Sequence, residues 1–335
     1  MKTSLIIPAW NAEKTIIECL LSSIQADNSP DEIIIVDDCS DDQTANLVLN
    51  FKQKYSKIKL YIMKINSGPS AARDYGVMKA EGEIIFFTDS DTIFLKNTFS
   101  TCLLTINKYK ADAVSGIYYP EPINYGKTQL YKALFFYFHF IKYDNPFLYQ
   151  TFNGQIGAIK KQVYIDVGGY NTDILWGMDY ENEEFGRRII KKYLLVLDPH
   201  FQVKHNFPNF SKLTRTYFMR VSTWMLIFMN DFKFESKGPA AIDSGLAAIS
   251  IPLSLFFLFL TLFYESAFFI IFTIFLAIWL YGYFQFYKFI LKTKPKFFIF
   301  SLLLNIWFSS VISCGAFWGV LKWISGKRAI IKQIK

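Results

Sequence analysis

Short apolar runs alternate with helical patterns through the first 118 residues. Five runs are rich in Ile, Val and Phe, as buried strands are. They read SLIIPA, EIIIVDD, IKLYIM, EIIFFTD and DAVSGIYY. The segments between them predict helices near 12–26, 42–55, 69–80 and 95–109, and Asp41 or Asp42 is placed to cap the second helix. This alternation predicts an α/β domain with a mainly parallel sheet and helices on both faces.

Residues 119–205 follow a less regular pattern. Helices are expected near 127–142, 161–167 and 181–193, with short strands around 155–159 and 194–204. The aromatic stretch YKALFFYFHFIKY fits an interfacial helix that touches lipid as well as it fits a buried core helix.

The pattern changes after His205. Residues 212–232 mix arginines with large apolar side chains, which predicts an amphipathic helix along a membrane. Three charge-free runs follow, at about 245–263, 266–287 and 297–321. Each is long enough to cross a hydrocarbon core of about 30 Å as a helix. We therefore expect an α/β domain at 1–205, an interfacial helix and linker at 206–240, transmembrane helices within 241–325 and a basic tail at 326–335.

Composition and charge agree with a membrane region. Hydrophobic residues make up 52% of the chain and aromatic residues 19%. Residues 1–205 hold 22 Lys and Arg against 24 Asp and Glu, whereas residues 206–335 hold 14 against 4. The positive charge flanks the apolar runs, so it suits an anionic membrane surface better than nucleic acid. The four cysteines show no CxxC spacing, which argues against a zinc site or a disulfide framework.

The side of the membrane is indicated by lysines. The loop 288–296 has four of them and should be cytoplasmic, together with the α/β domain at 1–205. Three spans would then place the basic tail outside, against the positive-inside rule. Either the rule is violated there, or the last run is re-entrant or interfacial.

Acidic residues follow two of the predicted strands. Asp37 and Asp38 follow IIIV, and Asp89 and Asp91 follow IIFFT. Ligands bind beyond the carboxyl ends of such strands. Two carboxylates two positions apart can face one divalent cation, and hard oxygen ligands suit Mg²⁺ or Mn²⁺. A solvated acidic loop is the alternative.

Four linked segments carry a resemblance. IIPAWNAEKTI, IIIVDDCSDDQT, NSGPSAARDYG and FFTDSD occur in this order, and together they resemble the family 2 inverting glycosyltransferases of the GT-A fold over roughly residues 3–205. The resemblance implies a nucleotide-diphosphate-sugar donor, and Mg²⁺ or Mn²⁺ as the metal that bridges its diphosphate.

The resemblance also implies roles for single residues. Asp89, Asp91 and the late His205 are implied metal ligands. Asp38, more than Asp37, is implied to read the nucleobase. The implied nucleotide-sugar site comprises Pro8, Asn11, Glu13, Asp37, Asp38, Arg73, Asp89 and Ser90. Taken alone, Asn11 and Glu13 fit helix capping equally well, and Arg73 fits a surface ion pair.

The acceptor side is implied by FNGQIGAIKK, with Gly154 and Gly157, and by GMDYENEEFGRR with its flanking Trp176 and its Arg188. In the register fixed by Phe185 and Arg188, Asn182 occupies the position where the family has an aspartate general base. An amide cannot accept that proton. Either Asp179, Glu181 or Glu183 acts instead, so that the candidate catalytic residues are Asp179, Glu181, Asn182 and Glu183, or the acceptor needs no base. A polyprenyl phosphate, ionised near neutral pH, would be such an acceptor.

The sequence therefore predicts a membrane-anchored inverting glycosyltransferase of the cell membrane, multi-pass, with its catalytic domain on the cytoplasmic side. Its expected partners are a nucleotide sugar, a lipid-linked acceptor and membrane lipids, with no nucleic acid. A polyprenyl-phosphate-linked glycan of a surface polysaccharide is the first expected acceptor. The alternatives are the bare polyprenyl phosphate as acceptor, and a non-catalytic scaffold that keeps the fold.

Overall fold

The computed structural model describes residues 1–173, 180–231, 238 and 242–326. The chain divides into two compact units. The first comprises Met1–Asn124 and Phe140–Phe207, and the second comprises Tyr125–His139 and Pro208–Lys335. The two units are described separately below.

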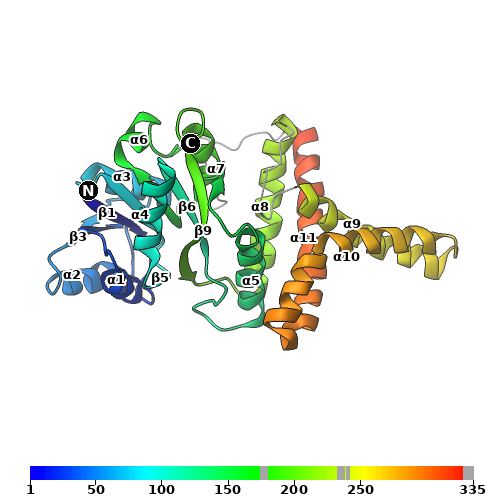
Figure 1. Cartoon of the computed structure of the whole chain (residues 1–335). Helices are drawn as coiled ribbons and strands as arrows, with labels where there is room; N and C mark the ends of the chain where they lie inside the picture. The colour runs from blue at the N-terminus through cyan, green and yellow to red at the C-terminus, as the bar shows by residue number, and fades with distance from the viewer. Residues whose placement is uncertain (174–179, 232–237, 239–241, 327–335) are drawn as a thin grey trace. The chain divides into compact units, whose positions relative to one another are not determined.

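A single sheet forms the centre of the first unit (Figure 1). Its strands run in the order β3-β2-β1-β4-β8-β6-β9-β5, and β7 pairs with β9. The strands β1 to β4 are parallel, as the sequence predicts. Beyond β4 the sheet is mixed, because β8 runs antiparallel between β4 and β6 while β9 is parallel to β6. The bounds are β1 (Thr3–Ala9), β2 (Glu32–Asp37), β3 (Ile58–Ile62), β4 (Ile84–Thr88), β5 (Thr92–Phe94), β6 (Ala113–Tyr118), β7 (Phe147–Leu148), β8 (Ile156–Lys160) and β9 (Leu195–His205).

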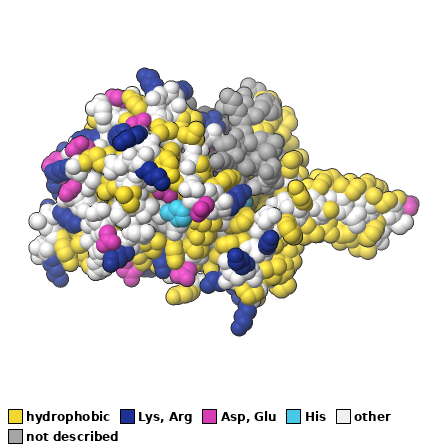
Figure 2. Space-filling model, in the orientation of Figure 1, with side chains coloured by type: hydrophobic (Ala, Val, Ile, Leu, Met, Phe, Trp, Pro, Cys, Tyr) yellow, Lys and Arg dark blue, Asp and Glu magenta, His cyan; other side chains and the backbone are white. Residues whose placement is uncertain are grey.

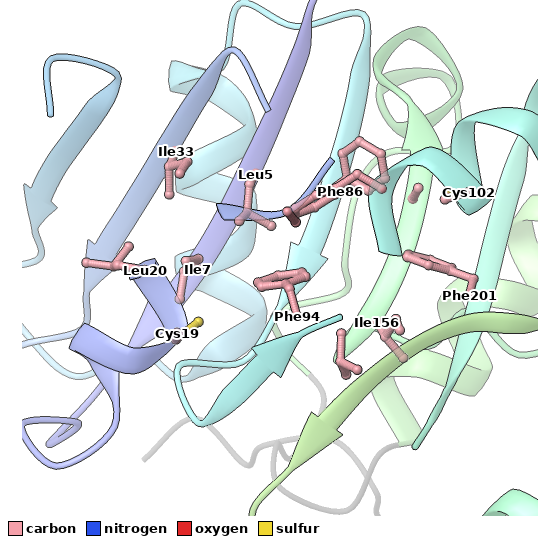
Figure 3. Close-up of a cluster of buried hydrophobic side chains, with 14 of the residues drawn as sticks. Leu5, Ile7, Cys19, Leu20, Ile33, Phe86, Phe94, Cys102, Ile156 and Phe201 are labelled. Carbon is pink, nitrogen blue, oxygen red and sulfur yellow. The ribbon is translucent and has the colours of Figure 1, made fainter. Parts of the chain in front are cut away.

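Helices cover both faces of this sheet, because successive side chains of a strand point to opposite faces. Leu5 and Ile7 of β1 lie in a core with α1, α2 and α4, shown in Figure 3. Ile6, between them, lies in a second core with α3, α6 and α7. The bounds are α1 (Ile16–Gln25), α2 (Thr44–Lys52), α3 (Pro69–Lys79), α4 (Thr98–Tyr109), α6 (Lys161–Asp166) and α7 (Tyr180–Ile189).

The second unit is helical. It contains most of α5 (Lys127–Ile141), with α8 (Phe210–Asp231), α9 (Ile242–Phe263), α10 (Phe268–Thr293), the short 3₁₀ helix η1 (Pro295–Phe297) and α11 (Phe298–Ile324). Three segments are long and apolar enough to cross a membrane, at Ser244–Phe263, Phe268–Thr293 and Pro295–Ile324.

The aromatic helix α5 contributes to the core of this helical unit. Tyr131, Leu134 and Phe135 are buried there. The Tyr131 hydroxyl donates to Asn305 Oδ1 of α11 at 3.1 Å, and Asn305 Nδ2 donates to the hydroxyl of Tyr287 at 2.8 Å. A buried polar group needs such partners, so the single Asn in the third apolar run is accounted for by hydrogen bonds to two tyrosines.

Candidate active site

Two carboxylates and an imidazole meet at the end of β4. Asp89 and Asp91 lie in the short link between β4 and β5. The strand β5 pairs antiparallel with the end of β9, which sets Thr92 opposite His205. This register brings His205 beside Asp91, with His205 Nε2 at 3.3 Å from Asp91 Oδ1. Ligand atoms of all three residues lie within 4.8 Å of one another.

Hydroxyl groups hold the link between the two strands. Thr92 Oγ1 donates to the carbonyl of Asp89 at 3.0 Å and lies 2.7 Å from Thr88 Oγ1. Thr88 Oγ1 in turn donates to the carbonyl of Gln155 on the loop before β8, at 3.1 Å. The position of the two aspartates is therefore fixed by three segments of the sheet.

This donor set fits a divalent cation. Mg²⁺ takes oxygen ligands at about 2.1 Å, and Mn²⁺ takes carboxylate and imidazole ligands. Donor atoms this close need only small side-chain rotations to reach one ion. Burial raises the pKa of Asp89, and the Arg73 guanidinium opposes that rise. A bound cation would favour the ionised carboxylate further.

Arg73 lies beside the carboxylates. Its side chain is 1% exposed, and Nη2 donates to Asp89 Oδ1 at 2.7 Å. The guanidinium carbon lies 5.6 Å from the ring centre of Tyr170. Nε and Nη1 have no hydrogen-bond partner among the described residues. Because unpaired buried donors are costly, these N–H groups favour an anionic ligand at this place.

The loops after β1 and β2 are joined by side chains. Asn11 Oδ1 accepts a hydrogen bond from the Asp41 amide at 2.9 Å, and Glu13 Oε2 accepts one from the Gln43 amide at 3.2 Å. Asp42 accepts one from the Thr44 amide at 2.9 Å, at the first residue of α2. The N-cap position itself is Gln43 and not Asp41 or Asp42, and its side chain makes no capping hydrogen bond. Asn11 and Glu13 thus hold the loop that leads into α2. Pro8, the first residue of the predicted nucleotide site, is buried within β1.

Asp37 and Asp38 are both buried. The Asp38 carboxylate accepts the backbone N–H groups of Ser67 and Gly68 at 2.8 and 2.7 Å, immediately before α3. The Ser40 hydroxyl donates to Asp37. Burial raises the pKa of Asp37, and the hydrogen bonds from Ser40 oppose that rise. Asp38 therefore anchors the start of the helix that carries Arg73.

Asn182 lies inside the domain, with its side chain 2% exposed. Its Oδ1 accepts the Gly154 amide at 3.2 Å and the Tyr170 hydroxyl at 3.1 Å. Its Nδ2 donates to Gln155 Oε1 at 3.4 Å. A carboxylate has no donor for the third bond. The structure therefore shows Asn182 in a buried network in which its amide both accepts and donates hydrogen bonds.

The glycines of the acceptor segment lie in crowded positions. A Cβ on Gly154 would lie 2.6 Å from the Tyr170 hydroxyl and 3.2 Å from Arg73 Cζ. A Cβ on Gly157, in β8, would lie 2.6 Å from the ring of Phe152. At Gly154 the backbone thus approaches the side chains that surround Arg73.

The acids near Asn182 differ in their surroundings. Glu181 is buried, and its charge helps to raise the pKa of Arg73 against the effect of burial. Glu183 is half-buried. Asp179 and Trp176 lie outside the described residues.

Arg188 supports the turn before the acidic helix α7. It forms an ion pair with Glu184 at 2.6 Å, and its Nη2 donates to the Gly169 carbonyl at 2.6 Å. Gly168 and Gly169 both have positive φ, at 80° and 62°, which glycine adopts without strain. Arg188 therefore fixes the glycine turn that presents Tyr170.

The sequence analysis missed Tyr170 and Gln155. Tyr170 contacts both Arg73 and Asn182, and Gln155 contacts Asn182. Gln155 stands inside the quoted segment FNGQIGAIKK, whereas Tyr170 stands in VGGYN, which the sequence analysis did not single out. Their only signal was that each lies next to a glycine.

Comparison with known proteins identifies the domain. The family model "Glycosyl transferase family 2" matches residues 4–168. The poly(ribitol-phosphate) beta-N-acetylglucosaminyltransferase TarS of Staphylococcus aureus is 36% identical over 118 residues, which are 34% of this chain and 20% of TarS. The GalNAc(5)-diNAcBac-PP-undecaprenol beta-1,3-glucosyltransferase of Campylobacter jejuni is 27% identical over 192 residues, 55% of this chain and 61% of that protein. The match thus spans about a fifth of TarS.

Solved structures give the same fold. The mannosyltransferase PcManGT of Pyrobaculum calidifontis, in complex with GDP-Man and Mn²⁺, has a TM-score of 0.59 at 15% identity, covering 97% of this chain and 88% of that one. Residues 1–349 of S. aureus TarS have a TM-score of 0.50 at 18% identity, covering 97% and 92%. The first unit therefore has the GT-A fold predicted from its sequence.

Proposed function

The chain belongs to glycosyltransferase family 2, and from that premise we propose that it transfers a sugar from a nucleotide-diphosphate sugar to a lipid-linked acceptor, with inversion at the anomeric carbon. The observation that carries the proposal is the cluster of Asp89, Asp91 and His205 at the end of β4, with Arg73 beside it. The glycan attached to this acceptor would belong to a surface polysaccharide or glycoconjugate.

Each residue of the cluster has a role in this proposal. Asp89, Asp91 and His205 would hold Mg²⁺ or Mn²⁺, which would supply positive charge to a diphosphate leaving group. Arg73 directs its remaining N–H groups to the donor phosphates. Asp38 and the joined loops around Asn11 border the nucleotide, at the edge where such sheets bind ligands.

A lipid-linked acceptor is supported by two observations. The helical unit has three segments apolar enough to cross a membrane. The C. jejuni relative is named for an undecaprenol-diphosphate-linked substrate. We propose that the enzyme lies in the cell membrane with its catalytic unit on the cytoplasmic side, because the lysine-rich segment 288–296 favours that side. The sequence predicts a loop for this segment, which instead comprises the end of α10 and the start of η1.

Bare polyprenyl phosphate is the second candidate acceptor, and the surroundings of Asn182 favour it. The residue at the position of the expected base is an amide held by three hydrogen bonds. An acceptor that is already ionised needs no base at that position. With a hydroxyl acceptor, the proton would go to Asp179, Glu181 or Glu183.

One experiment tests the function and separates the acceptors. The full-length protein in lipid nanodiscs is incubated with Mn²⁺ and a panel of nucleotide sugars. Polyprenyl phosphate or a polyprenyl-diphosphate-linked saccharide is added, and products are identified by mass. We expect metal-dependent release of nucleoside diphosphate and one glycosylated lipid. If no donor is hydrolysed or transferred, and no nucleotide binds in a metal-dependent way, the non-catalytic scaffold is favoured instead.

The proton acceptor is tested by Asp179→Asn, Glu181→Gln and Glu183→Gln, assayed with both lipids. With a saccharide hydroxyl, we expect one of the three variants to lose transfer while keeping donor binding. If all three leave transfer to polyprenyl phosphate unchanged, the acceptor that needs no base is supported. Asn182→Asp adds a third comparison, because faster transfer to a hydroxyl would favour the saccharide acceptor.

A further inference from the structure

The helices α8 and α11 run side by side in the same direction. In the first turns of α8, Thr214 Oγ1 accepts a hydrogen bond from Trp307 Nε1 of α11 at 3.0 Å. Further along both helices, Gly319 faces Ser222, and a Cβ on this glycine would lie 2.6 Å from the Ser222 carbonyl. A Cβ on Gly315 would lie 2.7 Å from another carbonyl of α8. Because the two backbones touch through glycines, α8 and α11 must share one orientation toward any membrane.

The helix α8 carries positive charge. Lys212 and Arg215 are exposed and Arg220 is half-buried. The helix is not among the segments apolar enough to span a membrane. If α11 crossed the bilayer, α8 would take these charges into hydrocarbon, where they are costly. If both helices lie at the interface, the same charges meet lipid headgroups.

One face of α11 is apolar and uncovered within the described part of the chain. Its exposed residues recur at spacings of three, four and seven positions, as on one face of a helix. Gly315 and Gly319, which meet α8, lie on a different face, and Trp307 at the border of the exposed face also contacts α8. The exposed residues are Ile299, Phe300, Leu303, Trp307, Cys314, Phe317, Trp318, Leu321 and Ile324. The pair of helices therefore presents an apolar stripe on α11 and positive charge on α8.

The helices α9 and α10 form a hairpin that leaves this pair. Ser254 Oγ of α9 donates to the Phe272 carbonyl of α10 at 3.2 Å. At the base of the hairpin, Ser313 Oγ of α11 donates to the Ala248 carbonyl at 2.9 Å. The fully buried residues of α10 all lie from Trp279 onward. The rest of the hairpin, residues 252–278, therefore projects beyond α11.

The projecting part has the surface of a membrane segment. In Figure 1, α8 lies on one side of α11 and the hairpin leaves on the other. Figure 2 shows hydrophobic side chains covering this arm. From Pro252 to Phe263 the helix rises by roughly 18 Å at 1.5 Å per residue. Starting from an interfacial α11, which itself lies about 5–10 Å below the headgroups, the arm reaches close to the far side of a core of about 30 Å.

We propose that the α9–α10 hairpin alone crosses the bilayer, while α8 and α11 lie together along the membrane surface. The apolar stripe of α11 faces the acyl chains, and Lys212, Arg215 and Arg220 face anionic lipid headgroups. Two crossings leave the C-terminal tail on the same side as the first unit. The basic tail and the lysine-rich segment 288–296 then obey the positive-inside rule together.

Cysteine labelling in intact cells tests the number of crossings. Glu265→Cys marks the link between α9 and α10, and Lys335→Cys marks the tail. With a membrane-impermeant maleimide, we expect Glu265→Cys to be labelled from outside and Lys335→Cys only after permeabilisation. The unsubstituted chain controls for the four native cysteines. Outside labelling of Lys335→Cys overturns the proposal in favour of three spans, and a protected Glu265→Cys overturns the crossing by the hairpin.

A depth measurement tests the in-plane position of α11. Leu303 and Phe317 are exposed on its stripe and lie roughly 21 Å apart along the helix. Fluorophores attached to cysteines at these two positions should be quenched most strongly by doxyl groups at the same depth in the bilayer. Ile249 and Phe263 of α9, exposed and equally spaced, form the matched pair and should differ in depth. Different depths for Leu303 and Phe317 would overturn the in-plane position.

A third measurement tests the headgroup contact. A label at Leu303 is compared in vesicles of zwitterionic lipid with and without phosphatidylglycerol. When the anionic lipid is present, the label should lie deeper in the bilayer, as measured by depth-dependent quenching. Lys212→Gln with Arg215→Gln should abolish that difference. An unchanged difference in the double variant would show that these charges do not bind headgroups. None of these readouts involves sugar transfer, so their outcome is independent of the proposed activity.

Discussion

Two histidines on β9 differ in what surrounds them. His205 lies within reach of both Asp89 and Asp91. The His200 ring instead lies 2.7 Å from the Asp144 carbonyl, and its side chain is exposed. Both residues are histidines on the same strand, so a comparison of the two isolates the effect of position along the strand. Only the histidine at the end of the strand can join the carboxylates at a metal ion.

We predict that His205→Ala lowers metal-dependent hydrolysis of the donor by roughly 100-fold or more, because loss of even an outer partner of a ligand costs 10- to 100-fold. Manganese titration of nucleotide binding gives the metal affinity directly. His200→Ala is the matched control and should leave both quantities unchanged. Equal losses in the two variants would mean that the effect is on the strand and not on the metal site.

Asn182 is the other residue whose surroundings decide its role. We predict that Asn182→Ala lowers the free energy of unfolding by about 1–3 kcal/mol, because it leaves the buried Gly154 amide and Tyr170 hydroxyl without their acceptor. The measurement is the midpoint of thermal unfolding in detergent, with the exposed Asn50→Ala as control. If Asn182→Ala unfolds at the same temperature and loses only transfer, the side chain acts in the chemistry instead.

At the scale of elements, glycines set the distance between α8 and α11. Gly319→Leu would place a branched side chain where a Cβ is already 2.6 Å from Met225 Cβ and the Ser222 carbonyl. We predict a lower thermal unfolding midpoint, since overpacking costs roughly 1–3 kcal/mol.

Gly282→Leu is the control for that substitution, because Gly282 is exposed on the apolar helix α10. It should unfold near the temperature of the unsubstituted protein. If Gly319→Leu is equally well tolerated, the two helices are not held by close backbone contact. The shared orientation of α8 and α11 would then lose its main support.

At the scale of the whole molecule, the second unit is assembled from two parts of the sequence. Residues 125–139 belong to it although they lie between strands of the first unit. A chain that ends after Phe207 would keep α5 without its helical partners. Tyr131, Leu134 and Phe135, buried in the full chain, would then be exposed to water.

We predict that this truncated chain aggregates without detergent, because a large exposed apolar patch favours association. The same truncated chain with Leu134→Gln and Phe135→Ser should remain more monodisperse. Size-exclusion chromatography with light scattering distinguishes the two. A monodisperse truncated chain without the substitutions would show that α5 does not need its partners from residues 208–326.

The sequence by itself determined most of the elements and their order, but not the short strands β5 and β7. Ile- and Val-rich runs specify β1 to β4, and the apolar runs specify α9 to α11, because the period and length of hydrophobic positions are local properties. The two acids after IIFFT marked the end of β4 as a candidate ligand site for the same local reason.

Tertiary structure decided which distant residues meet. The antiparallel pairing of β5 with β9 places His205 beside Asp91, and the packing of α7 buries Asn182 in a hydrogen-bond network. No local sequence pattern predicts that β8 runs antiparallel to its neighbours or that α8 and α11 pack in parallel. Register, direction and packing join residues far apart in the chain, and a hydrophobic period carries no information about such partners.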